Sequence, residues 1–567
     1  MSRTGFRWLL VAIAVVGTCS PVVAREGATR AGTARTADAL ITGGAVYTPD
    51  GILTPGAVAI VGDRIAWVGM SEEAGPWRGA STRVINAVGG LVLPGLVDAH
   101  GHLVNLGRML ATLNLGGTRS KDEVVWMVAV AQQRAAGRRW IRGRGWDQND
   151  WPVKAFPTWR DLEGTGDNPV YLKRIGGHAV WVNRTAMDLC HITRHTADPP
   201  GGRIVRDARG EPTGIFIDRA TELIAAHIPA PSDDQLDAWL GAAIAHCNRF
   251  GLVGVHDAGT SAREIHSLER LARAHPLPLH IYAMLDSDDS TLVNTWFARG
   301  PGTVAGGRVS VHAVKVYADG ALGSRGAALL QPYTDDPRNS GLLVNSPAYI
   351  DRLARRAYAA GFQCCTHAIG DRANRIVLDA YEHALDHRGT DRRFRIEHCQ
   401  VLTRNDLPRF ARLGVIASMQ PTHATSDMYW AADRVGKARL AGAYAWRSLL
   451  DSGARLAFGS DFPVESVDPV RGIYAAVTRE DERGWPPGGW RSAQKLTLRE
   501  AIDAFTRGAA YASFSEQQTG MLRAGMRADI TVLDRNLFAI PAHEILKAHA
   551  VATIVAGDVV WRMMPRR

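Results

Sequence analysis

The chain has 567 residues and a mass of 61.4 kDa, long enough for several domains or for one enlarged α/β barrel. Apolar residues make up 46% and charged residues 22%, which excludes a disordered or collagen-like chain. The formal net charge is +10, but the basic residues are dispersed among acidic ones. The composition therefore predicts a globular protein with no nucleic-acid partner.

The N-terminal residues have the pattern of an export signal. Arg3 and Arg7 precede an apolar, uncharged run over Trp8–Gly17, which is too short to span a bilayer as a mature helix. Small residues ending at Ala24 predict cleavage after that position. We expect a periplasmic or secreted protein with no stable membrane span, and a lipid anchor at Cys19 is the less favoured form.

The regions after this leader differ in pattern. Short apolar runs with turn signals, such as Ala57–Val61 and Ala528–Leu533, occur near both ends of the chain. Between them, strands alternate with helix-length segments, which is typical of parallel βα units. We predict a signal peptide (1–24), a linker (25–37), a composite β-sandwich (38–90 and 515–567), a (β/α)8 barrel (91–104 and 236–514) and an insertion or lid subdomain (105–235).

Eight apolar runs in the middle of the chain give the strand number of a closed barrel. A ninth run, Val170–Arg174, lies between the first and second strands and is assigned to the insertion. Thr497–Glu500 fits a capping box and predicts the start of a helix. The predicted barrel strands are Leu91–Val97, Leu252–His256, Leu279–Leu285, Val309–Tyr317, Phe362–His367, Phe394–His398, Val415–Met419 and Arg455–Gly459.

Two histidines follow the first predicted barrel strand. His100 and His102 are two residues apart, so their side chains are expected on the same side of an extended chain. Imidazoles are common ligands of zinc-like ions. This spacing alone is compatible with a metal site and with an ordinary structural pair.

Further polar residues lie at or near the ends of later strands. Side chains at the carboxyl ends of parallel barrel strands face one mouth, so residues distant in sequence can converge there. By strand alternation, Glu397 and Cys399 fall on the opposite face from His398, and we do not assign them as ligands. The candidates are Lys315, His367, His398 and Asp461.

In this order the motifs resemble the amidohydrolase superfamily, and more narrowly amidohydrolase family 3, the YtcJ-like branch that includes N-substituted formamide deformylases. The resemblance spans about residues 38–562. The matching stretches are Pro94–His102, Val314–Gly326, Thr366–Ala373, Arg395–Gln400, Gly459–Pro463 and Gly525–Ile530.

The resemblance implies a metal-dependent barrel with a divalent metal, Zn²⁺ being expected, as one or two ions per chain. His100, His102 and Asp461 would hold one metal, and His367 and His398 would hold a second.

Lys315 would bridge the two metals if its amine is carboxylated, because an ammonium group cannot coordinate a cation. The alternative is an unmodified interior lysine paired with Asp319 or Asp461.

Hydrolysis follows from such a site, since a metal lowers the pKa of bound water and polarises a carbonyl. Asp461 would carry the proton. His178, in a stretch that resembles the family, would donate to the developing oxyanion or be a structural histidine. His423 is a candidate for substrate binding with the same alternative, and His256 is a weaker candidate.

The insertion is rich in tryptophan: six of the 16 tryptophans lie between positions 126 and 181. Such rings suit either an aromatic lid over the substrate or the core of the insertion. Asp147 beside Trp146 favours the lid, because Gly143–Asp147 also resembles a family stretch. We therefore predict Trp146 and Asp147 as substrate-binding residues.

The sequence predicts an enzyme that hydrolyses a small-molecule linear amide of the N-acyl or N-formyl amine class. A cyclic-amide hydrolase is an alternative within the superfamily. A deaminase is less favoured, because Gly370 stands where those enzymes place a proton-carrying glutamate. A non-catalytic ligand-binding envelope protein would have lost ligands, whereas all six are present. The oligomeric state stays open, a homo-oligomer included.

Overall fold

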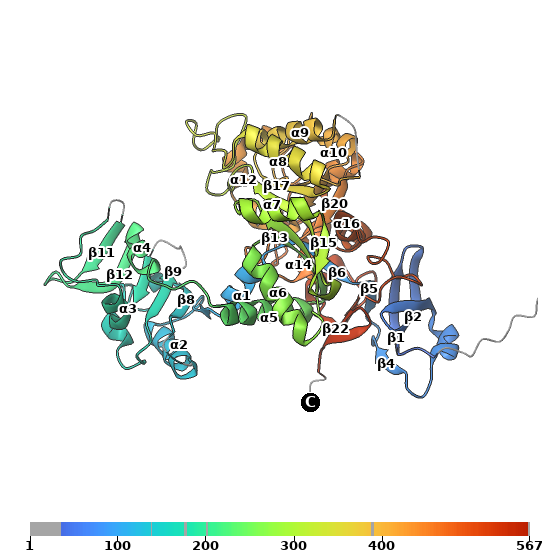
Figure 1. Cartoon of the computed structure of the whole chain (residues 1–567), viewed down its shortest axis with the longest axis horizontal. Coiled ribbons are helices and arrows are strands. Elements are labelled where there is room, and N and C mark those ends of the chain that lie inside the picture. The colour runs from blue at the N-terminus through green and yellow to red at the C-terminus, as the bar shows by residue number, and fades with distance from the viewer. Residues whose placement is uncertain are drawn as a thin grey trace, which may run out of the picture.

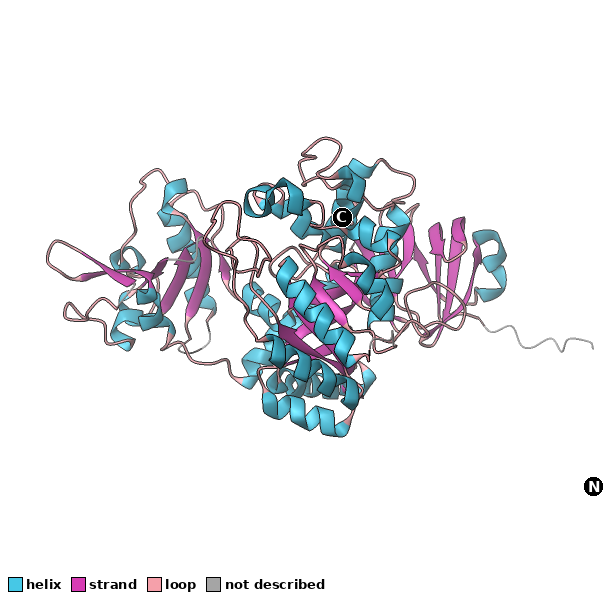
Figure 2. Cartoon of the chain, turned by 90° about the horizontal axis from the view of Figure 1, so that it is seen from above, coloured by secondary structure: helices cyan, strands magenta, loops and turns pink. Residues whose placement is uncertain are grey.

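The computed structural model describes residues 36–135, 137, 139–174, 179–199, 202–386 and 391–564. The predicted signal peptide and nearly all of the predicted linker lie outside the described residues. Three groups of strands are visible in the chain (Figure 1, Figure 2). One group is the barrel, one belongs to the insertion, and one is assembled from the two ends of the described chain.

The barrel consists of eight parallel strands paired in chain order. Seven of the eight predicted strands are present with closely matching bounds, the first being the exception, and β15 (Gly302–Val304) adds an antiparallel edge to β16. The barrel strands are β6 (Leu96–Gly101), β13 (Leu252–Thr260), β14 (His280–Asp286), β16 (Val309–Tyr317), β17 (Gln363–Ala368), β18 (Arg395–His398), β19 (Ile416–Met419) and β20 (Arg455–Phe458).

The first and last barrel strands meet just beyond their regular pairing. Asp461 N donates to His100 O at 2.7 Å, and His102 N donates to Phe462 O at 3.0 Å. Gly459 permits this approach, because a Cβ there would lie 2.4 Å from the His100 nitrogen. The closure brings the segment after β20 against the end of β6, where the predicted ligands lie.

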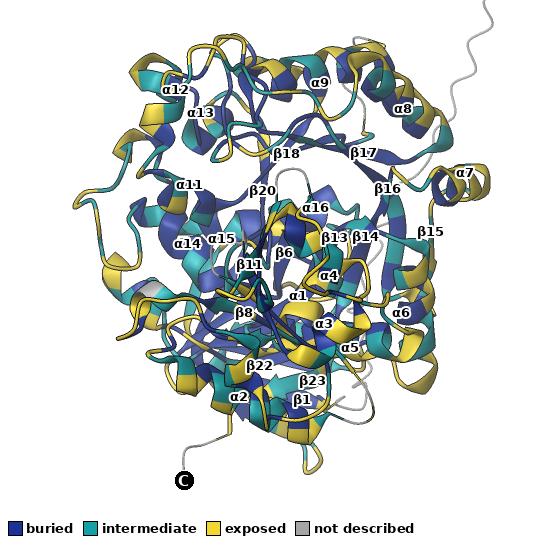
Figure 3. Cartoon of the chain, turned by 90° about the vertical axis from the view of Figure 1, so that its left-hand side faces the viewer, coloured by how far each residue is buried: buried dark blue, intermediate teal, exposed yellow. Residues whose placement is uncertain are grey.

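Helices surround the barrel, and Figure 3 shows their buried sides turned toward the strands. The α15 helix begins at the predicted capping box, with Thr497 and Glu500 each accepting the other's backbone N–H. The helices are α1 (Leu103–Leu110), α5 (Asp233–Arg249), α6 (Ala262–Ala274), α7 (Ser290–Arg299), α8 (Pro347–Ala360), α9 (Asp371–Ala384), α10 (Leu407–Leu413), α11 (Pro421–Asp427), α12 (Ala431–Leu440), α13 (Trp446–Asp451), α14 (Pro469–Thr478), α15 (Leu498–Phe505) and α16 (Arg507–Ala512).

The strand predicted over Leu91–Val97 is two strands. Residues 91–94 form β5, which pairs with strands of the terminal sheet, and the chain enters the barrel only at Leu96. Gly95 lies between them, and a Cβ there would come within 2.3 Å of Val253. The chain thus passes from one sheet to the other at a tight contact with β13.

The terminal sheet has eight strands, three of which come from the C-terminal end. Its core packs β1, β2 and β5 against β21 and β22. The two ends of the described chain therefore share one sheet; the predicted domain limits stay a prediction. The strands are β1 (Ala39–Thr48), β2 (Gly51–Val61), β3 (Arg64–Met70), β4 (Arg83–Asn86), β5 (Leu91–Pro94), β21 (Ile530–Leu533), β22 (Ala550–Val555) and β23 (Asp558–Arg562).

The insertion contains a six-stranded sheet of its own and lies to one side of the barrel (Figure 1). The run over Val170–Arg174 is its strand β9, as predicted. Across the described residues, no helix is long and apolar enough to cross a membrane. The insertion elements are β7 (Leu113–Asn114), α2 (Lys121–Arg134), β8 (Ile141–Trp146), β9 (Val170–Arg174), β10 (Ala179–Val182), α3 (Arg184–Leu189), β11 (Gly202–Arg206), β12 (Pro212–Asp218) and α4 (Glu222–Ala225).

Candidate active site

Three predicted ligands meet at the carboxyl end of the barrel strands. One ligand atom from each of His100, His398 and Asp461 lies within 4.8 Å of the others, and all three residues are buried. They come from β6, from the end of β18 and from the segment after β20. We call these three residues the ligand cluster.

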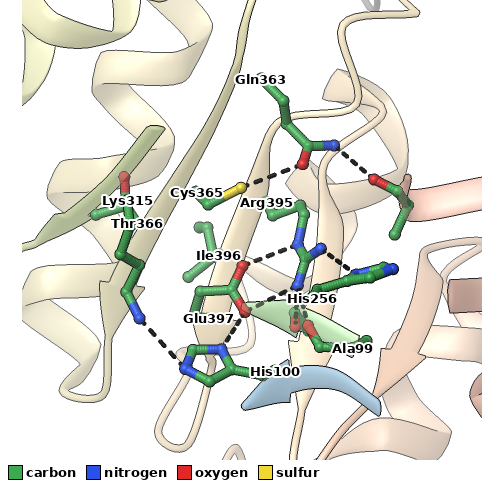
Figure 4. Close-up of polar contacts among 12 residues, drawn as sticks. Ala99, His100, His256, Lys315, Gln363, Cys365, Thr366, Arg395, Ile396 and Glu397 are labelled. Carbon is green, nitrogen blue, oxygen red and sulfur yellow. Dashed lines mark hydrogen bonds and ion pairs between the residues drawn. The ribbon is translucent and has the colours of Figure 1, made fainter. Parts of the chain in front are cut away.

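His100 is oriented by a carboxylate below the cluster. Its Nδ1 lies 2.6 Å from Glu397 Oε2, and neither side chain is exposed. An ionised carboxylate only accepts hydrogen bonds, so Nδ1 carries the proton and Nε2 presents its lone pair. That Nε2 faces Lys315 Nζ at 3.2 Å (Figure 4). It also lies 3.6 Å from Asp461 Oδ1.

His398 is oriented in a similar way by an amide. Its Nδ1 lies 2.8 Å from Gln420 Oε1, at the end of β19. The amide oxygen accepts from Nδ1, which leaves Nε2 available as a ligand. The ring centroid of His398 is 4.8 Å from that of His100 and 4.5 Å from that of His367.

Two histidines from other elements of the fold lie close to the Asp461 carboxylate. His102 Nε2 lies 3.0 Å from Oδ1, and His423 Nε2 lies 3.8 Å from Oδ2. His423 lies in the first turn of α11, and its Nδ1 contacts Gln400 Nε2 at 3.2 Å. The structure therefore brings both His102 and His423 to the ligand cluster.

His367 lies beside His398 on the neighbouring strand. Its Nε2 is buried, has no hydrogen-bond partner among the described residues, and lies 3.6 Å from Asp319 Oδ1. Asp319 accepts from the backbone N–H groups of Ala328, Ile369 and Gly370. Those bonds hold Asp319 in the loop below His367 and not on Lys315, so the proposed Lys315–Asp319 pair is not formed.

Burial sets the protonation of the imidazoles. Removal from water, followed by the nearby Lys315 charge, lowers the pKa of His100 to about 4 and that of His367 to about 3. Burial also lowers the pKa of His398 far below its ordinary value. These rings are therefore neutral at pH 7, which is the form that binds metals.

Different effects set the pKa values of Lys315 and Asp461. Burial lowers the pKa of Lys315, despite the nearby carboxylates of Glu397 and Asp461. Burial would raise the pKa of Asp461, but the His102 hydrogen bond and the neighbouring histidines outweigh it and lower that pKa. The site thus combines neutral imidazoles with an ionised carboxylate.

This donor set fits a divalent metal. His367 Nε2 and His423 Nε2 are buried nitrogens without hydrogen-bond partners in the described part of the chain. They adjoin the ligand cluster, whose nitrogens and carboxylate oxygen are the ligands that zinc-like ions prefer. Unpartnered buried polar atoms are costly, and coordination by an ion would satisfy them.

The structure does not bring Trp146 and Asp147 to the cluster. Trp146 is fully buried in the core of the insertion, where Nε1 donates to Leu172 O at 2.9 Å. Asp147 pairs with Arg174 of the same subdomain at 2.5 Å. These contacts place the tryptophan in the packing of the insertion, because its one polar atom already has a backbone partner. His178 lies outside the described residues.

Two residues that sequence reasoning missed support the cluster from inside the barrel. Arg395 and Glu397 are both fully buried, and Arg395 Nη1 contacts His256 Nδ1 at 2.8 Å. His256 therefore lies in the barrel interior as a partner of Arg395. The alternation of β18 was the available signal, since it sets Arg395 and Glu397 on one inward face.

Comparisons with known proteins agree with this architecture. The fold and the buried cluster define a metal-dependent hydrolase of the (β/α)8-barrel type. A family model described as the amidohydrolase family matches residues 83–561. The chain belongs to the amidohydrolase family.

Two similar proteins cover most of the chain, and a third matches a short part of it. YtcJ of Bacillus subtilis (strain 168), named as an amidohydrolase, is 35% identical over 486 residues, which are 85% of this chain and 90% of YtcJ. An N-substituted formamide deformylase of Arthrobacter pascens is 28% identical over 523 residues, covering 88% of this chain and 94% of that protein. An imidazolonepropionase of Streptomyces griseus matches at 47% identity over only 60 residues, 11% of this chain and 14% of that enzyme.

A solved structure supports the same assignment. An uncharacterized metal-dependent hydrolase from Pyrococcus furiosus is 30% identical and superposes with a TM-score of 0.72, covering 88% of this chain and 99% of that one.

Proposed function

We propose that this chain hydrolyses linear amides of the N-acyl or N-formyl amine class, using a divalent metal at the ligand cluster. The observation that carries the proposal is the convergence of neutral histidines and an ionised Asp461 at the barrel mouth. The similarity to an N-substituted formamide deformylase supports the substrate class. The substrate is a small molecule.

His100, His398 and Asp461 would hold the metal, with His102 and His367 beside them for a wider or second site. Zn²⁺ is the expected ion. A bound ion supplies Lewis-acid activation of water and of the substrate carbonyl. Asp461 would accept a proton at its carboxylate and return it to the leaving nitrogen, while His423 would contact the substrate. His178 is proposed as an oxyanion donor.

Lys315 is proposed as a carboxylated bridge between two ions. Its amine lies 3.2 Å from His100 Nε2, inside the site and nearly without exposure. Burial lowers the pKa of Lys315 and so increases the share of neutral amine, which is the form that can add to CO₂. An unmodified Lys315 with metal bound would argue for a single ion.

Gly370 argues against a deaminase. A Cβ at this position would lie 2.0 Å from the Ala328 carbonyl oxygen, so no side chain fits where a deaminase would need its glutamate. A cyclic-amide hydrolase is the second candidate function. The short similarity to an imidazolonepropionase supports this candidate, and the experiment below therefore includes cyclic amides.

The test is metal reconstitution followed by substrate competition. The metal-stripped protein is loaded with Zn²⁺, and turnover is compared across N-formyl amines, N-acetyl amines and cyclic amides of similar size. His100→Ala should lose metal and turnover, whereas His266→Ala, an exposed histidine on α6, should retain both. Turnover of cyclic amides alone would replace the linear-amide proposal with the second candidate.

We also propose that the chain is exported and cleaved after Ala24. The basic residues before an apolar run too short to span a membrane support this. N-terminal sequencing of protein recovered outside the cytoplasm should begin at Arg25. An uncleaved N-terminus on cytoplasmic protein would contradict the proposal.

A further inference from the structure

The barrel interior beneath the ligand cluster is polar. Arg395 reaches across it from β18 and is fully buried. Its guanidinium donates to Glu397 Oε1 at 2.8 Å, to His256 Nδ1 at 2.8 Å, to Ala99 O at 2.6 Å and to Ser418 Oγ at 2.8 Å (Figure 4). One arginine thus contacts β6, β13 and β19 and its own strand.

Glu397 connects this arginine to the cluster. Both of its oxygens accept from Arg395, at 2.8 Å and 3.1 Å, and Oε2 also accepts from His100 Nδ1 at 2.6 Å. No part of the Glu397 side chain is exposed. The guanidinium fork fixes the carboxylate plane, because two parallel hydrogen bonds allow little rotation.

The fixed carboxylate determines the ring orientation and the tautomer of His100. A carboxylate that cannot donate requires a proton on Nδ1, so the lone pair lies on Nε2 and points to Lys315 and Asp461. Without this partner the imidazole could turn or carry its proton on Nε2, and a protonated nitrogen cannot coordinate an ion.

We propose that Glu397 is the positioning residue for His100 and that Arg395 acts through it. The pair makes the barrel interior part of the metal site, although neither residue reaches the substrate. The inference rests on the metal dependence proposed above. A purely structural role, in which the pair only ties β18 to β6, would affect stability and leave metal affinity unchanged.

The test compares the Zn²⁺ affinity of Glu397→Gln and wild type by chelator competition on the metal-stripped proteins. We expect 10- to 100-fold weaker binding in the variant, the usual effect of losing the partner of a metal-bound histidine. The melting temperature of the metal-free proteins reports the fold separately.

The matched control is Asp406→Asn on the outer face of the barrel. Asp406 is also a buried carboxylate, and it accepts from Arg375 at 2.9 Å and from Arg409 at 3.2 Å. Like Glu397, Asp406 is thus a buried carboxylate paired with arginine, but it lies away from the ligand cluster. This variant should lower the melting temperature with less than a 3-fold change in Zn²⁺ affinity.

Glu397→Asp covers the case in which the glutamine variant does not fold. It keeps the charge for Arg395 but retracts the carboxylate from His100 by one methylene, so affinity should again fall at least 10-fold. A folded Glu397 variant with wild-type affinity, or an equal loss in Asp406→Asn, would overturn the inference.

The absorption spectra of the wild type and Glu397→Gln loaded with Co²⁺ in place of Zn²⁺ report the number of metal ligands. A lower number in the variant would also overturn the inference, because Glu397 would then be a ligand itself. Wild-type protein that binds no metal would refute the proposed function as well, so the two failures are distinguishable.

Discussion

Trp146→Ala separates a core role from a substrate role in the insertion. The Trp146 ring has no exposed surface, and its centroid lies 5.9 Å from Trp151 and 6.1 Å from Trp181. Removing a buried tryptophan costs about 3–5 kcal/mol, and the lost bond to Leu172 O adds about 1 kcal/mol. The free energy of unfolding of the insertion should fall by about that sum.

Hydrogen exchange across β8 and β9, together with limited proteolysis, measures this loss. The control is Trp126→Ala, since Trp126 is 66% exposed on α2 and its removal should change stability by at most about 0.5 kcal/mol. The ratio of kcat/KM for a benzyl and a methyl amide should be unchanged in Trp146→Ala. Normal protection of β8 with a reduced benzyl preference would refute the core assignment and restore the aromatic lid.

Five further substitutions test the site. His100→Ala and His367→Ala should each lose most bound metal, measured by atomic emission, while near-UV circular dichroism stays native; full metal content in both would contradict the assignment. Lys315→Ala should be nearly inactive and partly rescued by added acetate, and mass spectrometry showing an unmodified Lys315 amine in metal-loaded wild type would contradict a bridge. Asp461→Asn should fold normally but lose about two orders of magnitude or more in kcat, and wild-type turnover would move the proton role elsewhere. Gly370→Ala should lower the melting temperature because its Cβ has no space, and an unchanged value would show that the facing loop can move.

The sequence was most informative where one pattern has one structural solution. Apolar runs of strand length between helix-length segments predicted the eight-stranded barrel and the bounds of seven of its strands, and Thr497–Glu500 predicted the start of α15. The ligand cluster followed because parallel strands of a barrel end at one mouth.

The sequence was less informative where one sequence pattern is compatible with more than one structure and tertiary packing decides between them. Tryptophans in an insertion can line a pocket or fill a core, and the tertiary contacts of Trp146 decide this. Likewise, one run over Leu91–Val97 is long enough for a single strand, although Pro94-Gly95 was a signal for the break between two sheets.

Strand alternation explains both a success and a failure at β18. Arg395 and Glu397 are two residues apart and both face the barrel interior, as a period of two requires. The same rule put Glu397 away from His398, and yet both side chains reach His100. His398 has a φ of +76°, so the chain has already left the extended conformation there and its ring turns back over the strand end.

Asp461 shows the same departure after β20, with a φ of +60°. A residue other than glycine in this left-handed region costs about 1–2 kcal/mol, which the surrounding contacts must offset. Alternation therefore holds within β18 and fails at His398 and Asp461, where the chain turns out of the sheet. The direction of these two ligands depends on the turn that each residue makes, whereas Glu397, inside β18, faces the barrel interior as alternation predicts.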